Sequence, residues 1–250
     1  MFNNLIKAGT SSHIVNFPHK DDKKRWKRQL KEESKDWKYR SLSKNPIYFT
    51  TNSMGYRTHE FDFDNDTEYM LTLGCSNTYG LYLHEEERYS NLIEQQTGIK
   101  TYNLGICGGS ANIVMMNLSK LLYSGVKLPK VVIIQWPEYM RINLPYTEPD
   151  SGIYSIRAST EYSIKSKIFE EFVRQGNIIE TQSFWAKDLT YNILNSLNIK
   201  IIDFAKDKID SELYNVSYIE KIDKAYDNKH IGTETNASIC NFILEGLDSV

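Results

Sequence analysis

The arrangement of apolar and polar residues changes near residue 68. From there onward, short apolar runs alternate with longer stretches of helical periodicity. The run KVVIIQW at 130–136 is apolar almost throughout, as in a parallel strand buried on both faces. The apolar runs predict four strands, at about 68–74, 99–105, 130–136 and 198–205. The stretches between and after them predict helices at about 87–97, 110–125, 160–175, 183–196 and 233–248, with Thr233 as the N-cap of the last helix.

This alternation determines the expected fold class. Strands that alternate with helices imply right-handed crossovers and a three-layer α/β/α sandwich with a mostly parallel central sheet. We expect this domain to span residues 67–250. In such sheets ligands bind beyond the carboxyl ends of the strands, so the residues that follow each strand are the candidates for a functional site.

Residues 1–66 do not follow the alternation and are expected to form an N-terminal extension. The stretch 19–40 is strongly charged, and Trp26, Leu30 and Trp37 recur near helical spacing. This pattern predicts a basic helix with a narrow apolar stripe, packed on the core. A surface for an acidic partner is the alternative interpretation.

Composition excludes several classes of function. The net charge is −2, which gives no electrostatic reason to expect a nucleic-acid partner. The three cysteines, Cys75, Cys107 and Cys240, form no CxxC motif and indicate a reducing compartment, with all three thiols in the core. The chain shows no signal peptide and no apolar stretch of about 20 residues, so a cytoplasmic protein without a membrane span is expected.

Three polar groups follow strands or precede the last helix. Ser76 comes directly after the first strand, a glycine-rich loop with Gly108 follows the second, and Asp227 and His230 lie just before the final helix. A serine hydroxyl needs a base to become nucleophilic, and histidine suits that task near neutral pH. A carboxylate can orient the imidazole, and backbone N–H groups of a glycine-rich loop can bind an oxyanion.

These residues resemble a known family. LTLGCSNTYG at 71–80, YNLGICGGS at 102–110 and YDNKHIG at 226–232 are similar, in order and spacing, to three sequence blocks of the SGNH (GDSL-type) hydrolases. The resemblance covers roughly 68–250 and implies a flavodoxin-like sheet and a serine esterase. It implies Ser76 as nucleophile, His230 as base and Asp227 as its orienter, with the N–H groups of Ser76 and Gly108 in the oxyanion hole.

The chain departs from the family pattern in two places. Cys75 stands where the family usually has Asp, and QWPEYMR at 135–141 lacks the Asn whose side chain donates to the oxyanion. Loss of one such donor typically lowers the rate by about 10² to 10³. Asn112, Tyr139 and Arg141 are candidate substitutes.

The resemblance implies a short acyl ester as substrate, such as an O-acetyl group on a carbohydrate. An O-acyltransferase with the same triad, and an inactive glycan- or protein-binding module, are the alternatives. No cofactor is expected, because Gly80 is followed by Leu81 where a phosphate-binding loop needs Lys. No metal is expected either, because HEEER at 84–88 lacks metal-ligand spacing. The sequence leaves the oligomeric state open.

Overall fold

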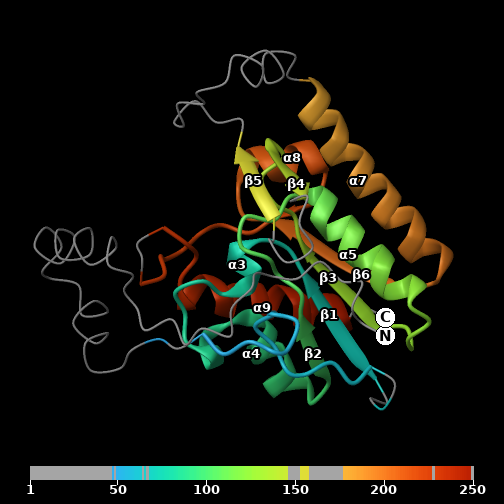
Figure 1. Ribbon diagram of the computed structural model, residues 1–250. Helices are drawn as coiled ribbons and strands as arrows, with labels where there is room; N and C mark the ends of the chain where they lie inside the picture. The colour runs from blue at the N-terminus through green and yellow to red at the C-terminus, as the bar shows by residue number, and fades with distance from the viewer. Residues whose placement is uncertain are drawn as a thin grey trace, which may run out of the picture.

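The computed structural model describes residues 47, 49–63, 65, 68–145, 153–157, 177–226 and 229–248. Their central feature is a parallel sheet in the order β2-β1-β3-β6-β7 (Figure 1). Its strands are β1 (Tyr69–Leu73), β2 (Lys100–Asn103), β3 (Val131–Gln135), β6 (Lys200–Ala205) and β7 (Ser217–Tyr218). The predicted α/β class with a parallel sheet is confirmed.

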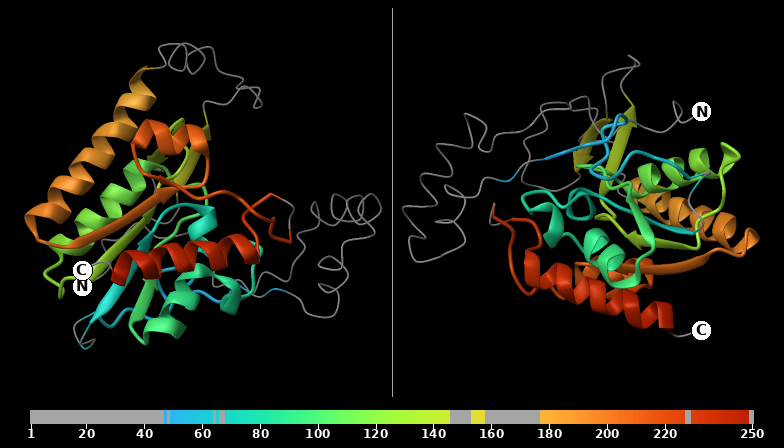
Figure 2. Two further views of the ribbon diagram at one scale, coloured as in Figure 1. Left: turned by 180° about the vertical axis from the view of Figure 1, so that it is seen from behind. Right: turned by 90° about the horizontal axis from the view of Figure 1, so that it is seen from below.

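Helices cover both faces of the sheet (Figure 2). One face carries α4 and α9, and the other carries α5 and α7. A short antiparallel pair, β4 with β5, lies beyond the main sheet. The helices are α3 (Ser76–Tyr79), the 3-10 turn η1 (Glu85–Glu87), α4 (Tyr89–Thr97), α5 (Ala111–Tyr123), α7 (Asn177–Ser196), α8 (Lys208–Tyr214) and α9 (Thr233–Asp248), and the pair is β4 (Arg141–Pro145) with β5 (Ile153–Arg157).

Alternate residues of the central strands point into opposite layers, as the pleat requires. Met70 and Ile133 belong to the core beneath α4 and α9, whereas Leu71, Val132 and Ile134 belong to the core beneath α5 and α7. Full burial of one such side chain stabilises the fold by about 1.5–3 kcal/mol. The uninterrupted apolar run of the third strand is thus explained by two buried faces.

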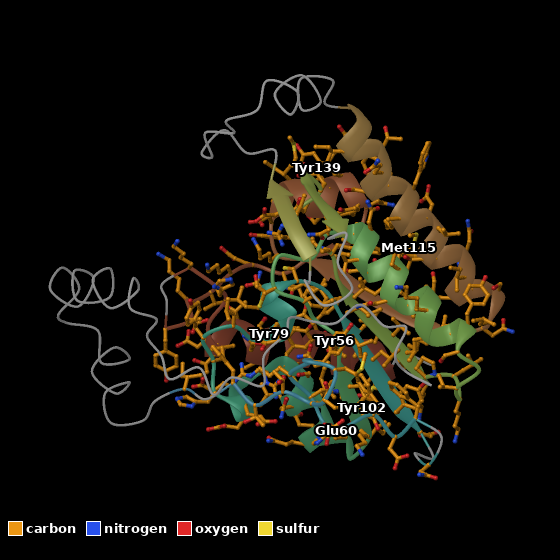
Figure 3. All side chains as sticks on the ribbon, in the orientation of Figure 1. Tyr56, Glu60, Tyr79, Tyr102, Met115 and Tyr139 are labelled. Atoms are coloured by element: carbon orange, nitrogen blue, oxygen red, sulfur yellow. The ribbon has the colours of Figure 1, made fainter. Side chains whose placement is uncertain are left out.

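An aromatic cluster joins the segment 49–63 to the sheet. Phe63 lies 4.6 Å from Tyr102 and 5.0 Å from Tyr69, measured between ring centroids. Tyr56 is fully buried, and its hydroxyl accepts a hydrogen bond from Asn117 on α5 (Figure 3). Burial raises the pKa of this tyrosine well above its usual range. These residues therefore share the core of the sheet, whereas the predicted basic helix at 19–40 lies outside the described residues.

Several sequence predictions need correction. The β4–β5 pair, α8 and β7 were not predicted, and the helix expected at 160–175 lies outside the described residues. Thr233 begins α9 instead of capping it. Asp223 does the capping, because its carboxylate accepts hydrogen bonds from the N–H groups of Glu234 (3.2 Å) and Thr235 (2.9 Å).

The cysteines differ in exposure. Cys75 and Cys240 are buried, as expected, but Cys107 is exposed, so its expected place in the core is wrong. It lies in a turn of the loop that follows β2, beyond the carboxyl end of that strand. In the part of the chain that the structure describes, no helix is long and apolar enough to cross a membrane.

Candidate active site

Ser76 stands at the carboxyl end of β1, where the chain turns into α3 (Figure 1). The turn depends on Gly74, since a Cβ there would lie 2.1 Å from Thr78 Oγ1 and 2.8 Å from the carbonyl oxygen of Gln135. Thr78 donates to Gln135 Oε1 at 2.8 Å, which links α3 to the end of β3. Ser76 therefore lies in a tightly packed turn that directly follows β1.

The structure brings His230 to this serine. Ser76 Oγ and His230 Nε2 are 3.0 Å apart, although the residues are separated by 154 positions in the sequence. If the hydroxyl donates in this pair, Nε2 must be the unprotonated nitrogen and Nδ1 must carry the proton. In that tautomer the imidazole can accept the serine proton during an attack.

The loop that carries His230 is held by backbone contacts at the histidine and at the residue that follows it. The His230 carbonyl accepts a hydrogen bond from Ala225 N at 2.9 Å. The next residue, Ile231, donates from its backbone to Asn77 Oδ1 at 3.3 Å and forms an isolated bridge with Lys224. Asn77 follows the serine directly, so one side chain ties the nucleophile segment to the histidine loop. Asp227, the predicted orienter, lies outside the described residues.

The predicted oxyanion loop forms a turn at 106–109. Gly109 N donates to Ile106 O at 2.8 Å, and Gly108, the third residue, has φ +78°. Ile106 N donates to the Gly74 carbonyl at 3.1 Å, which fastens this turn to the end of the strand that carries Ser76. The predicted donors, Ser76 N–H and Gly108 N–H, thus belong to two segments held together at the same edge of the sheet.

The three candidate substitutes for the missing asparagine have different surroundings. Arg141 is buried, and its guanidinium donates to Gly109 O at 3.0 Å and pairs with Glu138 at 3.1 Å. The backbone of Tyr139 donates to Asp210 Oδ1 at 3.1 Å and accepts from Ser183 at 2.7 Å, and Figure 3 places this residue near the β4–β5 pair. Asn112 is half-buried in the first turn of α5. Arg141 therefore braces the glycine loop through its carbonyl.

Two asparagines outside the predicted set of site residues support the site. Asn143 on β4 accepts from Ser110 N at 2.5 Å and donates to Gly108 O at 3.0 Å. Asn103, the last residue of β2, donates to Thr78 O at 2.6 Å. A polar residue at a strand end was a usable signal for Asn103. Asn143 carried no signal, because the strand that presents it was not predicted.

A pair of buried arginines lies beneath the loop between α3 and α4. Arg57 donates to the carbonyls of Gly80 and Leu83, the latter at 2.6 Å, and Arg88 donates to the Arg57 carbonyl. Burial lowers the pKa of Arg57 to about 10, and burial together with the Arg57 charge lowers the pKa of Arg88 to about 9. Both groups remain protonated at neutral pH, so the loop is held by charge-assisted hydrogen bonds.

Among the described residues, no three His, Cys, Asp or Glu side chains gather as a metal site would require. The site built from these residues consists of a serine at a strand end, a histidine within hydrogen-bond reach and a glycine turn beside them. Such a set can carry out acyl transfer through a covalent serine intermediate.

No protein-family model and no curated protein matches the chain. Among solved structures it is similar to TesA, with 10% identity, 72% of this chain and 98% of that chain covered, and a TM-score of 0.48. It is also similar to a lipolytic protein of the G-D-S-L family from Veillonella parvula DSM 2008 (12% identity, 74% and 100% covered, TM-score 0.46). A third is the acetyl xylan esterase Est2A from Butyrivibrio proteoclasticus (10% identity, 76% and 65% covered, TM-score 0.45). Identities and TM-scores of this size transfer neither family nor substrate to this chain.

Proposed function

We propose that this protein is a serine-dependent ester hydrolase. The observation that carries the proposal is the 3.0 Å separation of Ser76 Oγ and His230 Nε2 at the carboxyl end of a parallel strand. Ligand sites in open α/β sheets lie at this edge. A serine-histidine pair in this geometry is the arrangement that nucleophilic catalysis by a hydroxyl requires.

The reaction begins when Ser76 Oγ attacks the ester carbonyl and its proton passes to His230 Nε2. The negative charge that forms on the carbonyl oxygen is stabilised by backbone N–H groups, for which Ser76 and Gly108 are the proposed donors. His230 then returns the proton to the leaving alcohol, which leaves the acyl group on Ser76. Water, activated by the same histidine, releases the acid and restores the serine.

Asp227 is proposed to orient His230, since it stands three residues before the histidine. A carboxylate at Nδ1 would hold the imidazole in the tautomer that accepts the serine proton, and it would stabilise the imidazolium that follows. A short acyl ester, such as an O-acetyl group on a carbohydrate, is the proposed substrate. Transfer of the acyl group to a second alcohol instead of water would use the same steps.

The test is hydrolysis of p-nitrophenyl acetate together with labelling by a fluorophosphonate. We expect stoichiometric labelling at Ser76 and loss of hydrolysis by at least about 10³-fold in Ser76→Ala, because removal of a triad nucleophile leaves only residual catalysis. Ser217→Ala is the matched control, since Ser217 is exposed on β7.

Two outcomes would contradict the proposal. Equal hydrolysis by Ser76→Ala and the parent protein would exclude this serine as the nucleophile. A folded protein that takes up no fluorophosphonate would favour the alternative of a binding module. The proposed orienter is tested by Asp227→Asn, for which we expect a loss in kcat of up to about 10⁴-fold with the labelling site unchanged.

A further inference from the structure

The loop after α3 contains a strained turn at residues 80–83. Leu83 N donates to Gly80 O at 3.2 Å, which closes a four-residue turn. Its third residue is Tyr82, with φ +63°. A positive φ at this position of a turn favours glycine or asparagine, and for a bulky side chain it is an outlier. The backbone therefore adopts a conformation here that tyrosine by itself disfavours.

The surroundings impose this conformation. The Arg57 guanidinium donates to the carbonyls of Gly80 and Leu83, and these two residues are the ends of the turn. The same guanidinium lies 4.6 Å from the centre of the Phe49 ring, and that ring meets Tyr82 edge-on with centroids 6.2 Å apart. Strained residues persist where their neighbours over-determine them, and they concentrate at functional sites.

The Tyr82 ring lies against the candidate base. Its centroid is 5.8 Å from that of the His230 imidazole, and the two planes are tilted by 44°. The Tyr82 carbonyl accepts a hydrogen bond from Tyr226 N at 3.4 Å, so the turn also contacts the loop that carries the histidine. Ile47, Phe49 and Leu81 pack around Tyr82 and Tyr226 in one small apolar cluster. The Tyr82 ring is thus packed in this cluster and lies beside the imidazole at a tilt.

The contact with Ser76 and the proposed contact with Asp227 act at the two ring nitrogens, in the plane of the imidazole, whereas Tyr82 lies beside the ring. The torsion that turns the ring about the Cβ–Cγ bond has a broad energy profile, so a small rotation carries Nε2 away from a nearby oxygen. Misplacement of a reacting group by about 1 Å lowers a rate by about 10²-fold. A rigid aromatic surface beside the imidazole would limit this rotation at little entropic cost.

We propose that Tyr82 is a positioning residue, whose ring holds the His230 imidazole in the orientation that places Nε2 beside Ser76 Oγ. The left-handed backbone of the 80–83 turn, imposed by Arg57, aims the ring at the histidine. This role rests on the proposed function, in which His230 is the base. Tyr82 itself does not contact the reacting atoms in this mechanism.

The test compares Tyr82→Gly and Tyr82→Phe. Tyr82→Gly removes the ring and suits the positive φ, so it separates loss of the ring from loss of the turn. We expect its kcat for p-nitrophenyl acetate to fall about tenfold, with KM within about twofold, because the ring acts on the proton acceptor and not on substrate binding. Tyr82→Phe keeps the ring and should retain at least about half of the parent kcat. Tyr123→Ala is the control for loss of a tyrosine, since Tyr123 is 84% exposed at the end of α5.

A second readout does not depend on activity. In ¹⁵N-labelled protein, the ring nitrogens of His230 report the tautomer and its pH titration. We expect the Nε2 signal of the parent and of Tyr82→Phe to show the hydrogen bond to Ser76, and the Nε2 signal of Tyr82→Gly to move toward that of an imidazole without this bond. If the parent hydrolyses no ester and takes up no fluorophosphonate, the proposed function fails, while these spectra still decide the role of Tyr82.

Two results would overturn the inference. One is a Tyr82→Gly protein whose His230 ring signals and kcat match those of the parent. The other is a Tyr82→Phe protein as impaired as Tyr82→Gly, which would assign the effect to the hydroxyl and not to the ring. Should Tyr82→Gly not fold, Tyr82→Leu carries the same expectation, because leucine keeps the apolar packing without a flat ring.

Discussion

Two turns lie beside the candidate catalytic pair, and both need a positive φ at their third residue. One turn has glycine at this position and the other has tyrosine. Both the 106–109 turn and the 80–83 turn are closed by a hydrogen bond between their first and fourth residues. Both have a positive φ at the third residue, +78° at Gly108 and +63° at Tyr82. Glycine accepts this conformation without strain and leaves its N–H approachable, whereas tyrosine is strained there but presents a ring.

Both turns are also held from outside by a buried arginine. Arg141 donates to the carbonyl of Gly109, and Arg57 donates to the carbonyl of Gly80. The difference between the third residues therefore reflects what each turn presents to the site. The 106–109 turn presents backbone, which suits an oxyanion, and the 80–83 turn presents a side chain, which suits support of the imidazole.

The largest effect is expected from Gly108→Ala. A Cβ at positive φ strains the turn and displaces the N–H proposed to bind the oxyanion, so kcat should fall by about 10² to 10³. Gly98→Ala is the matched control, because Gly98 has φ +68° and a Cβ there meets no atom within 4 Å. Both variants should lose about 1 kcal/mol of unfolding free energy. Equal kcat in the two variants would show that the 106–109 turn has no catalytic role.

Removal of the clamp beneath the other turn should reduce stability. In Arg57→Met the carbonyls of Gly80 and Leu83 lose their buried donor, so the free energy of unfolding in urea should fall by about 2 kcal/mol or more. Arg57→Lys should lose less than Arg57→Met, because it keeps a charged donor, but it should still lose some stability, because an ammonium group cannot reproduce the fork of donors. A loss below about 0.5 kcal/mol in Arg57→Met would show that the clamp does not hold the turn.

The brace behind the 106–109 turn should have a smaller effect. Asn143→Ala removes the acceptor for Ser110 N and the donor to Gly108 O, so we expect about 1 kcal/mol lower unfolding free energy and about tenfold lower kcat. Asn143→Asp keeps the acceptor only. If it behaves like the parent, the bond to Gly108 O is dispensable and the Ser110 contact alone supports the turn.

The smallest effect is a pH dependence of stability at Asp210, which contacts the backbone of Tyr139. Burial raises the pKa of the Asp210 carboxyl to about 6, and the neighbouring Asp207 and Glu138 act in the same direction. The hydrogen bond that Asp210 accepts from Tyr139 N and the charge of Lys206 oppose this shift. The folded state therefore holds the proton more tightly than the unfolded state, and stability declines as pH rises from about 4 to 6.

The variant Asp210→Asn removes this dependence while it keeps an oxygen that accepts from Tyr139. At pH 7.5 we expect the variant to be about 1 kcal/mol more stable than the parent, and at pH 4 the two should be equal. Urea denaturation at both pH values measures the difference. The expected sign would be contradicted if Asp210→Asn were less stable than the parent at pH 7.5, while the two proteins were equally stable at pH 4.

The sequence by itself determined the α/β class and the order in which Ser76, the glycine loop and His230 follow one another. These features were readable because hydrophobic periodicity and turn residues are local, and a strand or a helix leaves its pattern within a few positions. The role of Asp227 stays a prediction. The prediction that Cys107 is buried was wrong. It rested on the usual preference of cysteine for the core, whereas this cysteine lies in an exposed turn after β2.

Only the tertiary structure decided how the site is held. The contact between Ser76 and His230 spans 154 positions in the sequence, and the contact between Arg57 and Gly80 spans 23. A local sequence pattern therefore predicts neither contact. Asn143 was invisible for the same reason, since its partners lie on another loop. The conflict between Tyr82 and its backbone likewise appears only once φ is known, because a tyrosine in a loop has no unusual sequence signature. The local patterns thus predict which segments form the site, whereas long-range hydrogen bonds and the positive φ of Tyr82 determine how its side chains are held.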